Sequence, residues 1–206
     1  MTTAAEALQR LIEGNQRFIA GAPKGVLTED TARDALKDGQ SPFAVILGCA
    51  DSRVAPELLF DQGLGELFVV RVAGHVVCAP ALESVEFAVE KLGAKLVIVL
   101  GHSRCAAVRA TLEEVQSPGT DASHQLASVI DHIRPSVEAV LKTADDRDLD
   151  ALMEDAVRTN VRVAVSQLRE DSALLKEGVQ SGGVLVLGAE YSLDTGCVDF
   201  FEGLHD

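Results

Sequence analysis

The sequence predicts an α/β fold: a central, mainly parallel sheet of four strands with an added antiparallel edge strand, flanked by helices, with an N-terminal helical arm. Residues 43–47, 67–71 and 96–100 are continuous apolar runs of strand length, the pattern of parallel strands that are covered on both faces. A helical pattern from about 80 to 92 separates the second run from the third, so strand and helix alternate. The closing segment, 184–201, carries the turn and spacing of a hairpin.

Helical spacing marks the N-terminal arm, residues 1–40. Apolar residues recur every three or four positions from about 3 to 20, which predicts an amphipathic helix that ends at Gly21. A second, short helix is expected over 28–39, because a threonine cap and two acidic residues open it and a glycine follows it. The α/β core, residues 41–206, follows this arm.

Helices also occupy the stretch between the third strand and the fourth. Helical patterns begin near Ser103, run from about 123 to 141, and continue as one long helix from about 149 to 175. The chain returns to strand over 184–191, and a turn leads to the antiparallel edge strand, 197–201. Because no internal repeat and no long linker interrupts this order, residues 1–206 are expected to form a single domain.

Composition excludes several classes of function. A net charge of -14 and a pI near 4.7, without a basic cluster, argue against nucleic-acid binding. The apolar runs are far shorter than the roughly 18 residues of a membrane span, and the amphipathic N-terminus does not resemble an export signal. We therefore expect a cytoplasmic protein whose four cysteines are thiols, metal ligands or core residues rather than a disulfide framework.

Reactive side chains follow two of the predicted strands. Cys49 comes directly after the first strand, and His102 and Cys105 follow the third, three residues apart. The carboxyl ends of neighbouring parallel strands lie at the same edge of a sheet, so the three side chains are expected to converge. Two thiolates and an imidazole suit tetrahedral zinc. A fourth position left to water is typical of a catalytic site, because zinc lowers the pKa of that water to about 7.

Asp51 and Arg53 lie in the loop that follows Cys49. An extended loop would bring both to the rim of the metal site, where they can form a charge-assisted pair. The carboxylate could then orient a zinc-bound hydroxide, or bind zinc itself and close the site. Taken singly, a cysteine at a strand end is more often a small core residue, and such a pair more often a surface ion pair. Their combination favours the metal site.

The motif Cys-x-Asp-x-Arg, followed about fifty residues later by His-x-x-Cys, resembles the signature of the beta-class carbonic anhydrases. The similarity extends to residues 11–18, 61–74 and 191–196, and so covers nearly the whole chain. The resemblance implies zinc, one per subunit, and the reversible hydration of carbon dioxide to bicarbonate and a proton by zinc-hydroxide attack. It also implies a homodimer or higher even oligomer, with the N-terminal helix packed across the partner; the apolar stripe could equally pack within its own subunit.

Residue by residue, the resemblance assigns roles to eight positions. It implies zinc ligands at Cys49, His102 and Cys105, a catalytic pair at Asp51 and Arg53, a substrate contact at Gln40, and an apolar carbon dioxide pocket lined by Phe68 and Ala73. An ordinary loop residue at Gln40 and an ordinary core residue at Phe68 remain open alternatives.

One position distinguishes between subgroups of the family, and two others depart from its usual pattern. One subgroup has a tryptophan three residues before the first cysteine, where this chain has Ile46. We therefore expect an open site, with water as fourth ligand, rather than a site closed by Asp51. His75 and Ala106 stand where bacterial relatives usually have asparagine and glycine. His75 is expected to be a hydrogen-bonded structural histidine or, alternatively, a proton shuttle or a contact for bicarbonate.

Two other functions remain open at this point. The chain could hydrolyse carbonyl sulfide or carbon disulfide on the same metal site, with a reshaped pocket. It could also be a catalytically silent zinc protein that serves in binding or regulation, although the intact pair of Asp51 and Arg53 counts against this.

Overall fold

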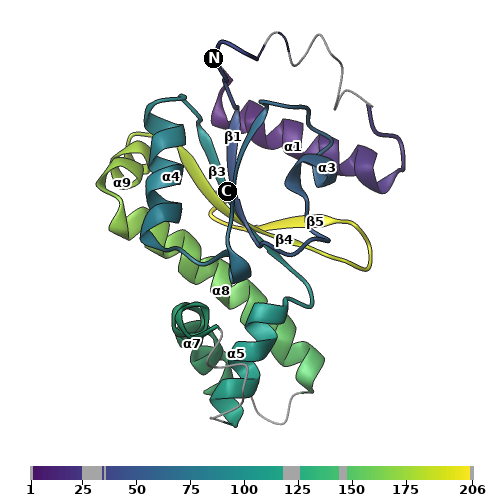
Figure 1. The fold of residues 1–206 in the computed structure, drawn as a ribbon, viewed down its shortest axis with the longest axis vertical. Coiled ribbons are helices and arrows are strands. Elements are labelled where there is room, and N and C mark those ends of the chain that lie inside the picture. The colour runs from purple at the N-terminus through teal and green to yellow at the C-terminus, as the bar shows by residue number, and fades with distance from the viewer. Residues whose placement is uncertain (1, 25–33, 35, 118–125, 144–147, 205–206) are drawn as a thin grey trace.

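The computed structural model describes residues 2–24, 34, 36–117, 126–143 and 148–204 (Figure 1). Five strands form one sheet in the order β2-β1-β3-β4-β5. The first four are parallel and β5 is antiparallel to β4, which confirms the predicted fold class. The strands are β1 (Ala44–Gly48), β2 (Leu67–Arg71), β3 (Leu96–His102), β4 (Leu185–Tyr191) and β5 (Val198–Glu202).

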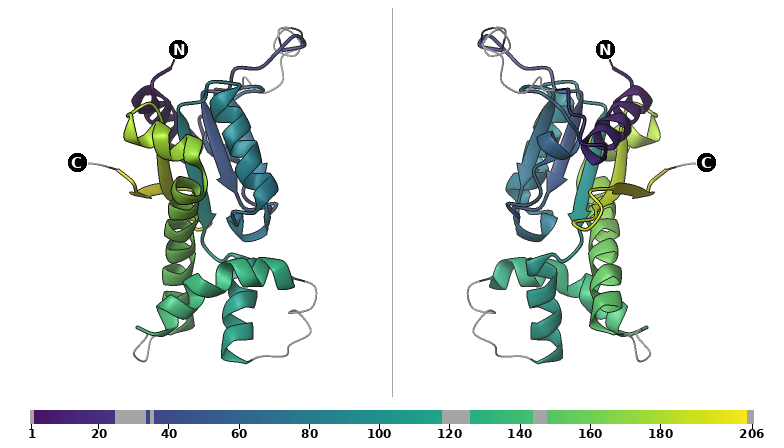
Figure 2. Two further views of the ribbon diagram at one scale, coloured as in Figure 1. Left: turned by 90° about the vertical axis from the view of Figure 1, so that its left-hand side faces the viewer. Right: turned by 90° about the vertical axis from the view of Figure 1, so that its right-hand side faces the viewer.

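Helices cover both faces of this sheet (Figure 2). On one face, Ala44 and Ile46 belong to the core that includes α1 (Ala4–Ile19). Val45 and Leu47 alternate with them and belong to the core on the opposite face. That second core is completed by α4 (Ala79–Glu90), α8 (Leu149–Asp171) and α9 (Ala173–Gln180). All five residues of β1 are buried because both faces are covered, as the unbroken apolar run predicted.

The N-terminal helix packs within its own chain. Thr3 and Glu6 form a capping box that satisfies the first backbone N–H groups of α1. Ala7 and Leu11 of its apolar stripe are fully buried in the core beside the sheet. These two residues of the stripe therefore pack within their own subunit.

A group of helices lies beyond the carboxyl ends of the parallel strands (Figures 1 and 2). It consists of α5 (Ala106–Gln116), α7 (Ala127–Leu141) and the first half of α8, which then continues along the sheet. The apolar core of this group contains Cys49 and Cys105. These helices thus cover the carboxyl ends of the strands that precede Cys49 and Cys105.

Several elements differ from the prediction. The single helix expected over 149–175 is two helices, because Ser172 has an extended backbone and its hydroxyl accepts a hydrogen bond from the Leu175 N–H, capping α9. Two short elements were not predicted: α3 (Pro56–Leu59) and the 3-10 turn η2 (Ala73–His75). Most of the short helix expected over 28–39 lies outside the described residues.

No described helix combines the length and the apolar character needed to cross a bilayer.

Candidate metal centre

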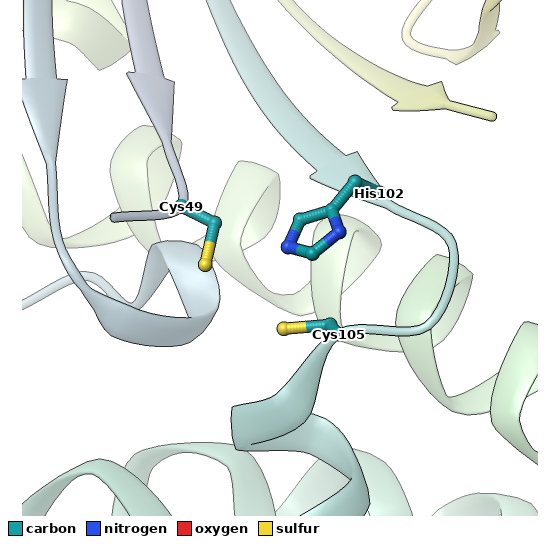
Figure 3. A group of neighbouring side chains, drawn as sticks. All are labelled: Cys49, His102 and Cys105. Atoms are coloured by element: carbon teal, nitrogen blue, oxygen red, sulfur yellow. The ribbon is translucent and has the colours of Figure 1, made fainter. Parts of the chain in front are cut away.

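Three side chains that could bind a metal ion converge at the carboxyl ends of the parallel strands. Cys49 follows β1 directly, His102 is the last residue of β3, and Cys105 caps the start of α5 (Figure 3). β1 and β3 pair in register, with Gly48 opposite Leu100, so the two strand ends lie side by side. The two Sγ atoms and a His102 ring nitrogen all lie within 4.8 Å of one another. The predicted convergence is therefore present in the fold.

The loop between His102 and Cys105 is held against the hairpin that joins β4 and β5. The Ser103 N–H donates to the Tyr191 carbonyl at 2.9 Å, and the Ser103 hydroxyl accepts from the Leu193 N–H at 2.9 Å. Arg104 adopts a left-handed backbone conformation (φ 57°) that turns the chain toward α5. Its guanidinium binds both carboxylate oxygens of Asp194, at 2.8 and 3.0 Å. These contacts fix where Cys105 enters the site.

His102 presents a lone pair to the two thiols. Its Nδ1 lies 2.9 Å from the Ser103 carbonyl oxygen, which can only accept, so Nδ1 carries a proton and Nε2 of the neutral ring carries the lone pair. Among the described residues, the buried Nε2 has no hydrogen-bond partner. Because a buried polar atom without a partner is costly, this nitrogen fits a cation held between it and the sulfur atoms. A metal-binding histidine commonly donates its other N–H in this way.

The two thiols behave as a pair. The Cys105 thiol donates to Cys49 and, with the N–H groups of Asp51 and Gly74, holds the pKa of Cys49 well below its ordinary value. The same interaction, with burial, raises the pKa of Cys105. One thiolate therefore forms readily, whereas the second needs a positive charge nearby. A divalent metal ion supplies that charge and deprotonates coordinating thiols, so the donor set fits zinc.

Asp51 and Arg53 form the predicted ion pair beside this cluster. Asp51 Oδ1 accepts from the Arg53 backbone N–H at 2.9 Å and from Nε at 3.0 Å, while Oδ2 accepts from Nη2 at 2.7 Å. Oδ2 also lies 3.9 Å from His102 Nε2, so the carboxylate borders the ligand cluster. The Arg53 guanidinium holds the pKa of Asp51 well below its usual range. The carboxylate is thus ionised and oriented at neutral pH.

Arg71, the last residue of β2, is a site residue that sequence analysis did not single out. Its Nε donates to the Cys49 carbonyl at 3.1 Å and its Nη2 to the Asp51 carbonyl at 2.6 Å. The side chain therefore ties the loop of Cys49 and Asp51 to the neighbouring strand. The apolar run of β2 ends at this arginine, which was the available signal, but the contact depends on pairing between strands.

The three predicted substrate residues lie in different places. Ala73, in η2, packs against the apolar core that contains Cys49. Phe68 pairs in register with Val45, well before the carboxyl end of the sheet, and its ring contacts Phe87 with the centroids 6.3 Å apart. Gln40 is exposed and precedes the amino end of β1, the end opposite Cys49. Of these three residues, only Ala73 therefore lies beside the Cys49, His102 and Cys105 cluster within one chain.

The two departures from the family pattern are accommodated structurally. Ala106 is the exposed first residue of α5, where alanine favours helix. His75 is fully buried in η2, and its Nε2 lies 3.0 Å from the Asn160 amide nitrogen. Burial lowers the pKa of His75 to about 4. The imidazole is therefore neutral near pH 7, which favours the structural alternative over the proton shuttle.

Comparisons with known proteins bear on the same residues. The family model described as carbonic anhydrase matches residues 44–198, which include Cys49, His102 and Cys105. The chain is 40% identical over 195 residues to carbonic anhydrase 2 of Mycobacterium tuberculosis, covering 95% of this chain and 91% of that protein. It is 38% identical over 200 residues to a carbonic anhydrase of Mycolicibacterium smegmatis, covering 97% and 94%. The beta-carbonic anhydrase CcaA has a similar structure, with a TM-score of 0.76, 26% identity, and coverage of 96% and 92%.

Proposed function

The chain belongs to the beta-class carbonic anhydrases, and on that premise we propose that it interconverts carbon dioxide and bicarbonate on a zinc ion bound by Cys49, His102 and Cys105. The observation that carries the proposal is the convergence of two thiols and an unpartnered buried imidazole nitrogen beside an ionised carboxylate. Three protein ligands are the number found in catalytic zinc sites. When bound in such a site, zinc supplies an acidic water molecule, and hence a nucleophile, near neutral pH.

Asp51 is proposed to accept and orient the hydrogen of that nucleophile. Oδ2 is the carboxylate atom near the cluster, 3.9 Å from His102 Nε2. Arg53 holds the carboxylate through two side-chain hydrogen bonds, which keeps it ionised and keeps it out of the ligand set. We therefore propose the open arrangement, in which Asp51 is a hydrogen-bond acceptor and not a ligand.

The wall beside the ligands is apolar, as carbon dioxide requires. Ala73, Val76 and Ala107 belong to the same hydrophobic group as Cys49 and Cys105. Carbon dioxide has no net dipole, so binding depends on such a surface rather than on polar contacts. We propose that Ala73 contributes to this surface and that the substrate reaches the ligands along it.

Gln40 and Phe68 can contribute to a site only if a second copy of the chain supplies them. Both lie away from Cys49 within one subunit. β2 is an edge strand of the sheet, and Phe87 beside it is 49% exposed. An unpaired strand edge flanked by an exposed aromatic ring favours association. We therefore keep the homodimer, or a higher even oligomer, as part of the proposal.

Metal analysis together with a hydration assay tests the proposed function. The purified chain is expected to contain about one zinc ion per subunit and to hydrate carbon dioxide in stopped-flow measurements with a pH indicator. Removal of the metal by a chelator should abolish turnover, and added zinc should restore it. Full activity in the chelated preparation, or faster hydrolysis of carbonyl sulfide than hydration of carbon dioxide, would refute the proposal.

A further inference from the structure

A buried asparagine on α8 is hydrogen-bonded to the turn that touches the metal ligands. Asn160 is 3% exposed, and its Nδ2 lies 3.0 Å from the Gly74 carbonyl oxygen and 3.0 Å from His75 Nε2. Its Oδ1 accepts from the Ser136 hydroxyl of α7 at 3.1 Å. The amide therefore connects α7 and α8 to η2.

The chemistry of its neighbours fixes the orientation of this amide. The Gly74 carbonyl oxygen can only accept, so the atom that faces it must be Nδ2 rather than Oδ1. The second hydrogen of Nδ2 then goes to His75 Nε2, which must be unprotonated. The lowered pKa of His75, about 4, agrees with this neutral imidazole. Asn160 thus acts as a double donor toward two successive residues of η2.

The turn that Asn160 holds has an unusual backbone. Gly74 and His75 both have positive φ angles, 67° and 46°, and the second is uncommon for a residue with a side chain. The turn is also pressed against α7, because a Cβ at Gly74 would lie 2.5 Å from Ile133 Cδ1. Strained backbone of this kind persists where the surrounding structure over-determines it. The two donated hydrogen bonds provide that constraint.

The η2 turn also contacts Cys49, one of the proposed metal ligands. The Gly74 N–H donates to Cys49 Sγ at 3.3 Å. A hydrogen bond to a thiolate withdraws charge from the sulfur and fixes its direction, and such outer contacts tune metal affinity. This N–H belongs to the peptide unit directly before the one whose carbonyl Asn160 binds, and the two units are related by the backbone angles of Gly74 alone.

We propose that Asn160 is a positioning residue for the metal centre. By binding the Gly74 carbonyl and the His75 ring, Asn160 holds the Gly74 N–H against the Cys49 thiolate. This inference rests on the proposed binding of zinc by Cys49. In this proposal Asn160 contacts neither a metal ligand nor the substrate. It acts through the η2 turn. Its loss should therefore alter the metal–sulfur bond as well as the stability of the fold.

The test compares two buried asparagines. Asn160→Asp keeps the shape of the side chain and replaces both N–H donors with an oxygen that faces the Gly74 carbonyl. Asn15→Asp is the matched control, because Asn15 is also buried and donates to two carbonyls, those of Leu59 and Gly196, away from the metal ligands. Thermal unfolding, zinc affinity by competition with a chelator, and the sulfur-to-metal absorption band of the cobalt-substituted protein are measured for each.

Both variants should unfold at a lower temperature, but only Asn160→Asp should weaken zinc binding, by about 10-fold or more, and shift the cobalt band. Wild-type zinc affinity with an unchanged cobalt band in Asn160→Asp would overturn the inference. So would an equal loss of zinc affinity in Asn15→Asp, which would indicate a general effect of instability.

Ser136→Ala provides a second, milder variant should Asn160→Asp fail to fold. It removes the hydrogen bond to Asn160 Oδ1 and leaves both donated bonds in place, so a smaller loss of zinc affinity in the same direction is expected. No change in zinc affinity or in the cobalt band would then count against the inference. Failure of the proposed function looks different, since the wild-type chain itself would bind no zinc or would not hydrate carbon dioxide.

Discussion

The Asp51 carboxylate and the Arg53 guanidinium meet through two parallel hydrogen bonds, with Nε 3.0 Å from Oδ1 and Nη2 2.7 Å from Oδ2. The carboxylate is mostly buried, with 14% of its side chain exposed, whereas half of the Arg53 side chain is exposed. The arginine therefore fixes the direction of the carboxylate from the solvent side. Asp51 Oδ2 is left facing the ligand cluster with a second lone pair available.

Asp51→Ala is expected to keep its zinc and to lose turnover by about 100-fold to 10,000-fold, the usual contribution of a positioned acid–base group. Metal analysis and stopped-flow hydration check this together. Asp199→Ala is the control, since Asp199 forms a comparable pair with Arg158 away from the ligands. Loss of zinc from Asp51→Ala would instead indicate that the carboxylate is a ligand.

Cys49→Ser and His102→Ala are each expected to lower the zinc content well below one ion per subunit. Each change removes one of three donors, and the remaining two cannot complete a tetrahedral site. Cys78→Ser is the control, because Cys78 lies at the start of α4 and is not in the ligand cluster. Normal zinc content in Cys49→Ser would exclude this cluster as the metal site.

Arg71→Lys is expected to retain zinc and to lower turnover by about 10-fold to 100-fold. A lysine cannot span the Cys49 and Asp51 carbonyls as the guanidinium does, and small displacements of a catalytic loop are costly. Arg162→Lys serves for comparison, since Arg162 pairs with Glu202 at half exposure. Equal effects in the two variants would argue against a role for Arg71 in holding the loop.

His75 predicts a dependence of stability on pH. Its pKa is lowered from 6.5 to about 4 by burial, so between these values the unfolded chain binds the proton and the folded chain does not. This contribution is complete above about pH 6.5 and is lost as the pH falls toward 4; it amounts to about 3 kcal/mol. The free energy of unfolding is measured by denaturant titration at several pH values for wild type and His75→Asn, both with chelator. It should fall less steeply with decreasing pH in the variant than in wild type. Parallel curves would contradict the prediction.

The sequence predicted those parts of the fold and site whose determinants are close together in the chain. The strand 67–71 has the predicted bounds, and Asp51 and Arg53 are two residues apart in one loop. Arg71 and Asn160 were not found, because their contacts join residues 20 to 86 positions apart and exist only once strands and helices have packed. The break at Ser172 was missed because the apolar period continues across it; the serine cap was the available signal.

The pairing of β1 with β3 has a consequence for how this protein tolerates mutation. A one-residue slip of β1 against β3 would carry Cys49 about 3.3 Å along the strand and turn its side chain to the opposite face. Apolar residues occupy both faces of β1, so the slipped strand would still be covered. A one-residue deletion within β1 should thus be able to yield a folded chain that has lost its metal site. Selection against insertions and deletions in β1 therefore depends on the position of Cys49 more than on whether the chain folds.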